Sequence, residues 1–496
     1  MAFENSQSFT IDSKKMVGIE QFENICRVEV LAEKPIKKVI HISALPKIVS
    51  SEKVGENIDF SGRTAYKIVY ESEDGSLSSV ETYVEWQNKI ACGYDNYYLC
   101  PNIQENTVSG FSSNELAVSS LLNLEVFAII QERLTPVSSL DGYVVDEKTY
   151  EGQRLVNTVR ETFNDVLEQE YNGKIDEVLY YTADIKIKNV NPMVDSISVD
   201  GEFNVVINAI ENGRIITITK TADFKQEFGA LSVIPSNIVD AILRLNDLKV
   251  TASYNETDNK TNLIISIESV VYAEIYNKET ITLVQDAFSI KKETKATYEC
   301  VNADLFEFCG VKNDTVIGCF EVDKELYEVC FAVGASGAIS EVKNQNDGVS
   351  IVGCCFVEAI CETENREKVK VQGVVPFTVE VADIGEDDKV CINTKISSCK
   401  LRGQKEIEVV LEFNINYKKE NNVCIGYLSQ IEEVGDNKET TSAIKVYVVK
   451  EKEDLFAVAK AMLVRPEVIT SQNPEIENNL SEGTRIVVYN GLDINF

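Results

Sequence analysis

The sequence predicts a mainly β protein with some α structure. We expect three tandem antiparallel β-rich domains followed by a small domain with the element order β-α-α-β. Two observations support this fold class. Alternating apolar and polar stretches recur at intervals of about 140 to 150 residues, and the last fifty residues change to helical periodicity. The length of 496 residues also exceeds what one ordinary core accommodates.

The repeated unit centres on a glycine followed by apolar or aromatic residues at mainly alternate positions. The three glycines are Gly62, Gly201 and Gly353. Alternation of this kind is typical of a β-strand, and a glycine at its start predicts entry from a turn or a bulge. The same order of segments in all three places indicates tandem copies of one domain.

A second strand follows in each copy, at 119–130, 266–276 and 406–417. It is clearest in the third, where one face carries Ile407, Val409, Leu411, Phe413, Ile415 and Tyr417. The opposite face is acidic or amidic, as expected for an antiparallel strand with one side in the core. An aspartate-x-aromatic step then closes the first two copies, at Asp141 to Tyr143 and at Asp286 to Phe288.

Helical patterns are few before the C-terminal region. A stripe at i, i+4 and i+8 through Val159, Phe163 and Leu167 predicts a helix that bridges the first two copies, with Gly173 as its C-terminal cap. Ser236 could cap a short helix over 238–245. The predicted divisions are 1–150, 173–295 and 296–430 for the three copies, 151–172 for the bridging helix, 431–444 for an acidic linker and 445–496 for the last domain.

The last domain carries local signals for each of its elements. Asp454 is a suitable N-cap for a helix that begins at Leu455, and Pro466 suits the first turn of a second helix. Asn473 and Pro474 predict a turn, and Gly483 permits a tight entry to the final strand. Strand, helix, helix and strand are therefore expected in that order.

Composition argues against several function classes. The 48 basic and 80 acidic residues give a net charge of −32, which repels phosphate backbones and anionic lipids and makes nucleic-acid binding improbable. The sequence shows no signal peptide, and no apolar run approaches the roughly 20 residues that cross a bilayer. The predicted compartment is the cytosol.

Nothing in the sequence indicates an enzyme. The single histidine, His41, lies in an alternating segment that predicts a strand, which is a poor setting for nucleophilic catalysis. One histidine also excludes a mixed cysteine and histidine zinc cluster, so no metal or cofactor is predicted. Ten of the 13 cysteines lie between Cys300 and Cys424. They could stay reduced as small apolar residues or become cross-linked after assembly.

The repeated unit resembles the SPOCS domain of spore-coat assembly proteins from endospore-forming Firmicutes, including Clostridia, and the C-terminal domain resembles a LysM module. This resemblance covers nearly the whole chain. It implies a morphogenetic scaffold made in the mother-cell cytoplasm and recruited to the forespore surface and spore coat. It also implies that the LysM domain holds the morphogenetic coat ATPase (SpoIVA-like), with other coat proteins as further partners in protein-protein interaction.

A LysM groove would lie between the first strand–helix loop and the loop before the last strand. The candidate partner-binding residues are Lys452, Glu453, Asp454, Leu455, Phe456, Asn473, Pro474, Glu475 and Ile476. Lys452 stands where the family has a glycine, and the acidic residues add negative charge. We therefore expect protein binding rather than peptidoglycan binding, with Phe456 as the one aromatic candidate for glycan stacking.

Three alternatives remain open at this stage. The chain could bind peptidoglycan of the spore cortex or wall through its LysM domain. It could be an enzyme that uses carboxylates or one of the clustered cysteines. It could also be a self-assembling coat protein whose exposed strand edges pair between chains.

Overall fold

The computed structural model describes residues 9–29, 34–137, 140–345, 347–382, 384–386, 388–437, 443–476 and 480–489. Within these ranges the chain is mainly β, and every strand pairing is antiparallel. This confirms the predicted fold class at the level of a mainly β protein with a small helical component.

The first eighteen strands form three groups of six. The first group is β1 (Phe9–Glu29), β2 (Ile36–Val54), β3 (Asn57–Ser72), β4 (Leu77–Ala91), β5 (Tyr97–Phe111) and β6 (Glu115–Leu134). The second is β7 (Val144–Asn172), β8 (Glu177–Met193), β9 (Ser196–Glu211), β10 (Arg214–Gly229), β11 (Ile238–Asn255) and β12 (Lys260–Phe288). The third is β13 (Lys292–Glu321), β14 (Leu326–Gln345), β15 (Gly348–Thr363), β16 (Lys368–Ala382), β17 (Lys389–Leu401) and β18 (Glu406–Asp436).

Each group has the same topology, so the chain contains three copies of one fold. In every copy the second, third and fourth strands form one sheet, and the first, sixth and fifth strands form another. The two sheets pack face to face around an apolar core. The second strand also carries the same β-bulge in each copy, where the register skips one residue after Val39, Val178 and Val329.

The three repeated glycines lie inside the third strand of each copy and not at its start, so the predicted entry from a turn is wrong. A β-bulge does lie opposite each glycine, where the register of the second strand skips one residue after Ile48, Ile187 and Ile339. The cross-strand partners of the glycines in the fourth strand are the aromatic residues Trp86, Phe224 and Phe377. A Cβ atom built on Gly62 would lie 2.0 Å from the Trp86 ring, and similar clashes occur in the other copies. Each glycine therefore makes room for a ring that lies across the strand.

The predicted bridging helix over 151–172 is also wrong, because this segment forms the larger, C-terminal part of β7. Residues four apart lie on one face of a strand as well as of a helix, so Val159 and Phe163 fit both periods. Glu161 and Asp165 lie at alternate positions with Val159 and Phe163, on the same strand face, but they are polar. The alternation of apolar and polar residues that indicates a strand is therefore not visible in the sequence. Pairing with β12 along the whole of β7 decides the outcome.

Two further expectations need correction. Residues 238–245, predicted as a helix, begin β11, where alternate side chains such as Val239 and Leu243 pack against the core of the second copy. Residues 431–436 of the predicted linker continue β18 and stay paired with β13, with one irregularity in the register at Val434. Asn437 then donates its side-chain amide to the carbonyls of Ser289 and Lys292. Residues 438–442 lie outside the described residues.

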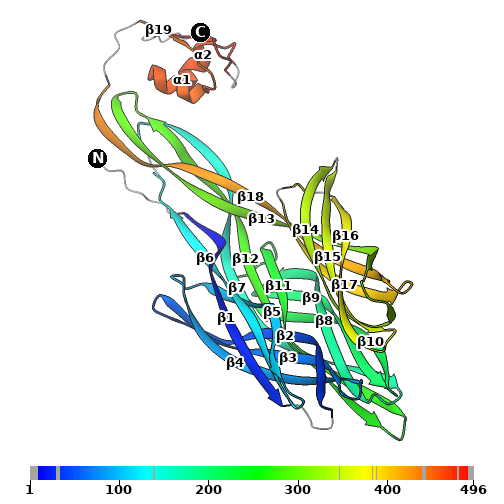
Figure 1. The fold of residues 1–496 in the computed structure, drawn as a ribbon. Coiled ribbons are helices and arrows are strands. Elements are labelled where there is room, and N and C mark those ends of the chain that lie inside the picture. Colours follow the sequence, from blue (N-terminus) through cyan, green and yellow to red (C-terminus); the bar gives the residue numbers. More distant parts are fainter. Residues whose placement is uncertain are drawn as a thin grey trace.

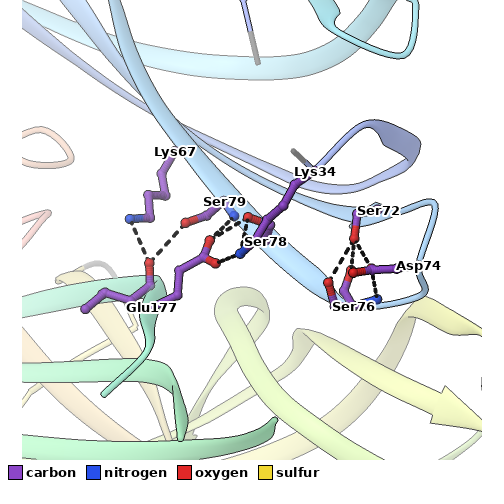
Figure 2. A network of polar contacts seen from close by, with 9 residues as sticks. Lys34, Lys67, Ser72, Asp74, Ser76, Ser78, Ser79 and Glu177 are labelled. Atoms are coloured by element: carbon purple, nitrogen blue, oxygen red, sulfur yellow. Dashed lines mark hydrogen bonds and ion pairs between the residues drawn. The ribbon is translucent and has the colours of Figure 1, made fainter. Parts of the chain in front are cut away.

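The three copies pack against one another through shared apolar clusters, and together they form what is here called the body (Figure 1). A polar contact reinforces the joint between the first and second copies (Figure 2). Glu177, at the start of β8, accepts hydrogen bonds from the Ser78 hydroxyl at 2.6 Å and the Ser79 amide at 2.8 Å. The Lys34 amine pairs with the same carboxylate.

The C-terminal unit comprises β19 (Ile444–Val448), α1 (Leu455–Met462), α2 (Pro466–Gln472) and β20 (Arg485–Tyr489). This is the predicted order of strand, helix, helix and strand. In Figure 1 the ends of β13 and β18 extend from the body as a long ribbon, and the C-terminal unit lies beyond the ribbon tip.

Candidate functional site

The C-terminal unit is built on a two-stranded sheet with both helices packed on one side. β19 and β20 pair in antiparallel register, with Tyr447 opposite Ile486. Ile486 and Val488 are buried against Val458 of α1 and Ile469 of α2. The apolar spacing predicted from the sequence thus forms a small separate core.

The loop between β19 and α1 is held by its own polar groups. Lys452 has a φ of +63°, in the left-handed region that favours glycine. Glu453 accepts from the backbone amide of Lys450 at 2.8 Å and from the Tyr447 hydroxyl at 2.8 Å. These two hydrogen bonds, the amide first, lower the pKa of Glu453. The loop is therefore ordered even though a lysine occupies its glycine-like position.

Asp454 is the N-cap of α1, as predicted. Its side chain accepts a hydrogen bond of 2.7 Å from the amide of Ala457, which would otherwise lack a partner at the start of the helix. Pro466 begins α2, where its missing N–H costs nothing.

Asn473 serves inside the unit rather than at its surface. Its amide nitrogen donates to the carbonyls of Ile469 and Val487 at 2.8 and 2.9 Å, and its oxygen accepts from the Val487 amide at 3.1 Å. Gln472 pairs in the same way with the backbone of Tyr489. Two side-chain amides therefore satisfy the outer edge of β20, as a neighbouring strand would.

The remaining predicted groove residues divide into two sets. Lys452, Asp454, Pro474 and Glu475 are exposed. Leu455, Phe456 and Ile476 are half-buried and pack against the core of the unit. The structure thus brings the apolar members together and leaves the charged members facing solvent.

The unit docks on the body through α1. The ring of Phe456 meets the ring of Phe288 at the end of β12, with the centroids 5.4 Å apart. Lys460 contacts both carboxylate oxygens of Asp286, at 2.7 and 2.6 Å. Although partial burial would lower the pKa of Lys460, the hydrogen bond and the charge of Asp286 raise it.

Sequence reasoning missed this docking contact. The sequence predicts only that Asp286 and Phe288 close the second copy, and it carries no signal for Lys460. The repetition of the Asp-x-aromatic step in two copies is the one sequence signal that points to a tertiary contact at these positions. In the first copy, the equivalent Tyr143 donates a hydrogen bond to Glu433 near the end of β18.

The other side of the small sheet is uncovered by described residues. Ile444, Val446 and Val448 of β19 are 52%, 62% and 51% exposed, and Tyr489 of β20 is 41% exposed. Cross-strand register places Tyr489 beside Ile444 on this face. Because the helices pack on the opposite side of the sheet, these four side chains form an outward apolar face, here defined as Ile444, Val446, Val448 and Tyr489. Arg485 and the half-buried Val487 lie on the same side of the sheet.

The edge of β19 adds a second docking feature. Among the described residues β19 pairs only with β20, so its outer backbone groups have no strand partner there. An unpaired edge beside exposed apolar side chains is suited to receiving an extended segment of another protein.

Comparison with known proteins returns no match to a family model, to a curated protein or to a solved structure. In the described part of the chain, the helices are too short to span a bilayer.

Proposed function

We propose that this chain is a non-enzymatic scaffold for endospore coat assembly, similar to the clostridial spore morphogenetic protein SipL. Three SPOCS-like copies would form its body, and the C-terminal unit would act as a LysM-like docking module. In this proposal the module holds a SpoIVA-like coat ATPase and thereby tethers the basement layer of the coat to the forespore surface from the mother-cell cytoplasm.

The outward apolar face of the C-terminal unit is the observation that carries this proposal. Solvent-exposed apolar side chains clustered beside an unpaired strand edge are typical of a protein-docking surface. On the helix side of the unit α1 contacts Asp286 and Phe288, so a partner would approach the sheet side. The three-copy body supports the scaffold role, since it supplies a large rigid support for one projecting module.

Peptidoglycan binding has weaker support. Phe456, the aromatic candidate for stacking on a sugar ring, already packs against Phe288. Asn473, the polar candidate, uses its amide for three internal hydrogen bonds. Neither side chain is free to hold a glycan while the unit is docked.

The proposal is tested by retention of the SpoIVA-like ATPase from sporulating cells on the full-length chain. We expect Val446→Lys to reduce retention at least tenfold, since it places a charge in the outward apolar face. Val166→Lys is the matched control, because Val166 is 63% exposed on β7 of the body. Both substitutions are at exposed positions and should leave the fold intact.

Equal retention by the wild-type chain and Val446→Lys would refute docking through this face. Strong co-sedimentation of the full chain with purified peptidoglycan, abolished when residues 445–496 are removed, would favour the glycan-binding alternative instead.

A further inference from the structure

A cavity of about 370 Å³ opens between the first and second copies. One wall comes from β2 and β5 of the first copy, and the other is the outer face of the sheet formed by β11, β12 and β7. Pockets at joints between domains are common ligand sites, and a volume of this size suits a small molecule.

Two arginines line the cavity from opposite sides of β12. Arg160 of β7 is the cross-strand partner of Tyr272, and Arg244 of β11 is the partner of Val270. Positions 270 and 272 share one face of the strand, so both arginines project from that same face. The Arg160 guanidinium carbon lies 5.7 Å from the centroid of the Tyr272 ring. A cation–π contact of this kind holds the guanidinium at the cavity wall.

Neither arginine has a carboxylate partner within ion-pair distance in the described part of the chain. Asp247, three residues after Arg244, is held by other basic side chains. Lys47 and Arg63 hold Asp247, and Lys47 also holds Glu268 at 2.8 Å. Arg160 is exposed and donates to the Ser51 hydroxyl at 3.4 Å, which is a neutral partner. In a chain with 32 more acidic than basic residues, the cavity therefore carries two guanidinium charges that no carboxylate neutralises in the described part of the chain.

We propose that this cavity binds a small oxyanion, a carboxylate or a phosphate, between Arg160 and Arg244. The planar guanidinium group matches both oxyanions through paired N–H donors. Asn102 from the first copy adds a side-chain amide to the same lining, and Tyr272 supplies an aromatic wall. Because both copies contribute, a bound anion would strengthen the joint between them. This site is independent of the docking role of the C-terminal unit.

The test is thermal unfolding of the full-length chain titrated with inorganic phosphate and, separately, with citrate. Ionic strength is held constant with sodium chloride, because screening alone stabilises a chain of high net charge. We expect a saturable rise in Tm with at least one of the two anions. A response to phosphate alone identifies a phosphate site, and a response to citrate alone identifies a carboxylate site.

Substitutions of the two arginines test whether the anion that raises the Tm binds between them. Arg160→Gln and Arg244→Gln should each weaken the apparent affinity at least tenfold. Arg244→Lys keeps the charge and guards against a folding defect, and it should also weaken binding because the paired donors are lost. Arg214→Gln is the matched control, since Arg214 is exposed on β10 away from the cavity lining, and it should bind as the wild type does.

Two results would overturn the proposal. The first is a Tm that depends on ionic strength alone, with no saturable response to either anion. The second is a saturable response that persists unchanged in Arg160→Gln and Arg244→Gln, which would place the anion elsewhere.

Discussion

The imidazole ring of His41 meets the ring of Tyr180 edge to face, with 5.2 Å between the centroids. Tyr180 in turn stacks against Phe331 at 5.8 Å. Each of the three residues follows the bulge in the second strand of its copy, and each pairs with the residue seven positions after the repeated glycine. Each of the three copies therefore contributes one equivalent ring to a shared contact.

This position makes stability depend on pH. Burial and, next, the charge of Lys370 lower the pKa of His41 to about 4, with Glu358 partly opposing them. Neither ring nitrogen has a hydrogen-bond partner among the described residues. Since the pKa of an unfolded histidine is about 6.5, the folded state binds the proton less readily than the unfolded state. Stability is then full above pH 6.5 and falls as the pH drops toward 4, by on the order of 3 kcal/mol.

We predict that His41→Phe removes this pH dependence, because phenylalanine does not titrate. The equivalent residue of the third copy, Phe331, is already phenylalanine, so the position accepts this ring. The measurement is the difference in Tm between the variant and the wild type at pH 7.5 and pH 5. Carboxylates titrate alike in both proteins, so the difference isolates His41. The variant should gain most at pH 5, and a difference that stays constant with pH would contradict the argument.

The repeated glycines should not tolerate a methyl group. In Gly201→Ala the new Cβ would lie 2.3 Å from the Phe224 ring and 2.3 Å from the Lys186 carbonyl oxygen. Overpacking of this kind costs roughly 1–3 kcal/mol, and the backbone contact leaves little room for relief. Urea unfolding should show the loss. Gly229→Ala, which meets nothing within 4 Å at the end of β10, is the control and should stay near the wild type.

Asn473→Ala should loosen α2 and β20 without affecting the body. It removes three hydrogen bonds and leaves the amide and the carbonyl of Val487 unsatisfied, at a cost of about 2–3 kcal/mol, whereas the Ile469 carbonyl keeps the backbone amide of residue 473. Amide hydrogen exchange at Val487 should accelerate strongly. Gln472→Ala removes the more exposed pair with Tyr489, and its effect should be smaller. Equal protection of the Val487 amide in Asn473→Ala and the wild type would show that the Asn473 side chain does not hold β20 in place.

The docking of α1 should depend on both an ion pair and a ring pair. Asp286→Asn removes a partly exposed ion pair that contributes about 0.5–1 kcal/mol. Phe288→Ala removes a buried ring that packs on Phe456, at a cost of about 3–5 kcal/mol. Both changes lie on β12, and Phe288 completes the apolar cluster of the C-terminal unit from outside it, so every side chain of the unit itself is kept. The double variant should speed hydrogen exchange over 455–462.

Lys452→Gln serves as the control for docking, because Lys452 is exposed in the loop before α1. Its exchange rates over the helix should match those of the wild type. Exchange that is unchanged in the double variant would mean that the contact with Asp286 and Phe288 does not hold the unit.

Much of the C-terminal unit could be predicted because its signals are local. Asp454, Pro466 and Gly483 act on backbone groups within a few residues of themselves, so the sequence is sufficient to place the elements they bound. The same reasoning placed His41 in a strand. It did not show that Asn473 faces inward, because that depends on where β20 returns.

The sequence by itself determined the threefold repetition, the apolar faces of the long strands and the element order of the last fifty residues, since periodicity and capping are properties of neighbouring residues. Only the tertiary structure decided that 151–172 is a strand, because residues four apart satisfy both helical and strand periods until β12 supplies the hydrogen bonds. The meeting of His41 with Tyr180 and the pairing of Lys460 with Asp286 join positions more than a hundred residues apart. Such contacts arise from packing and leave no periodic trace in the chain.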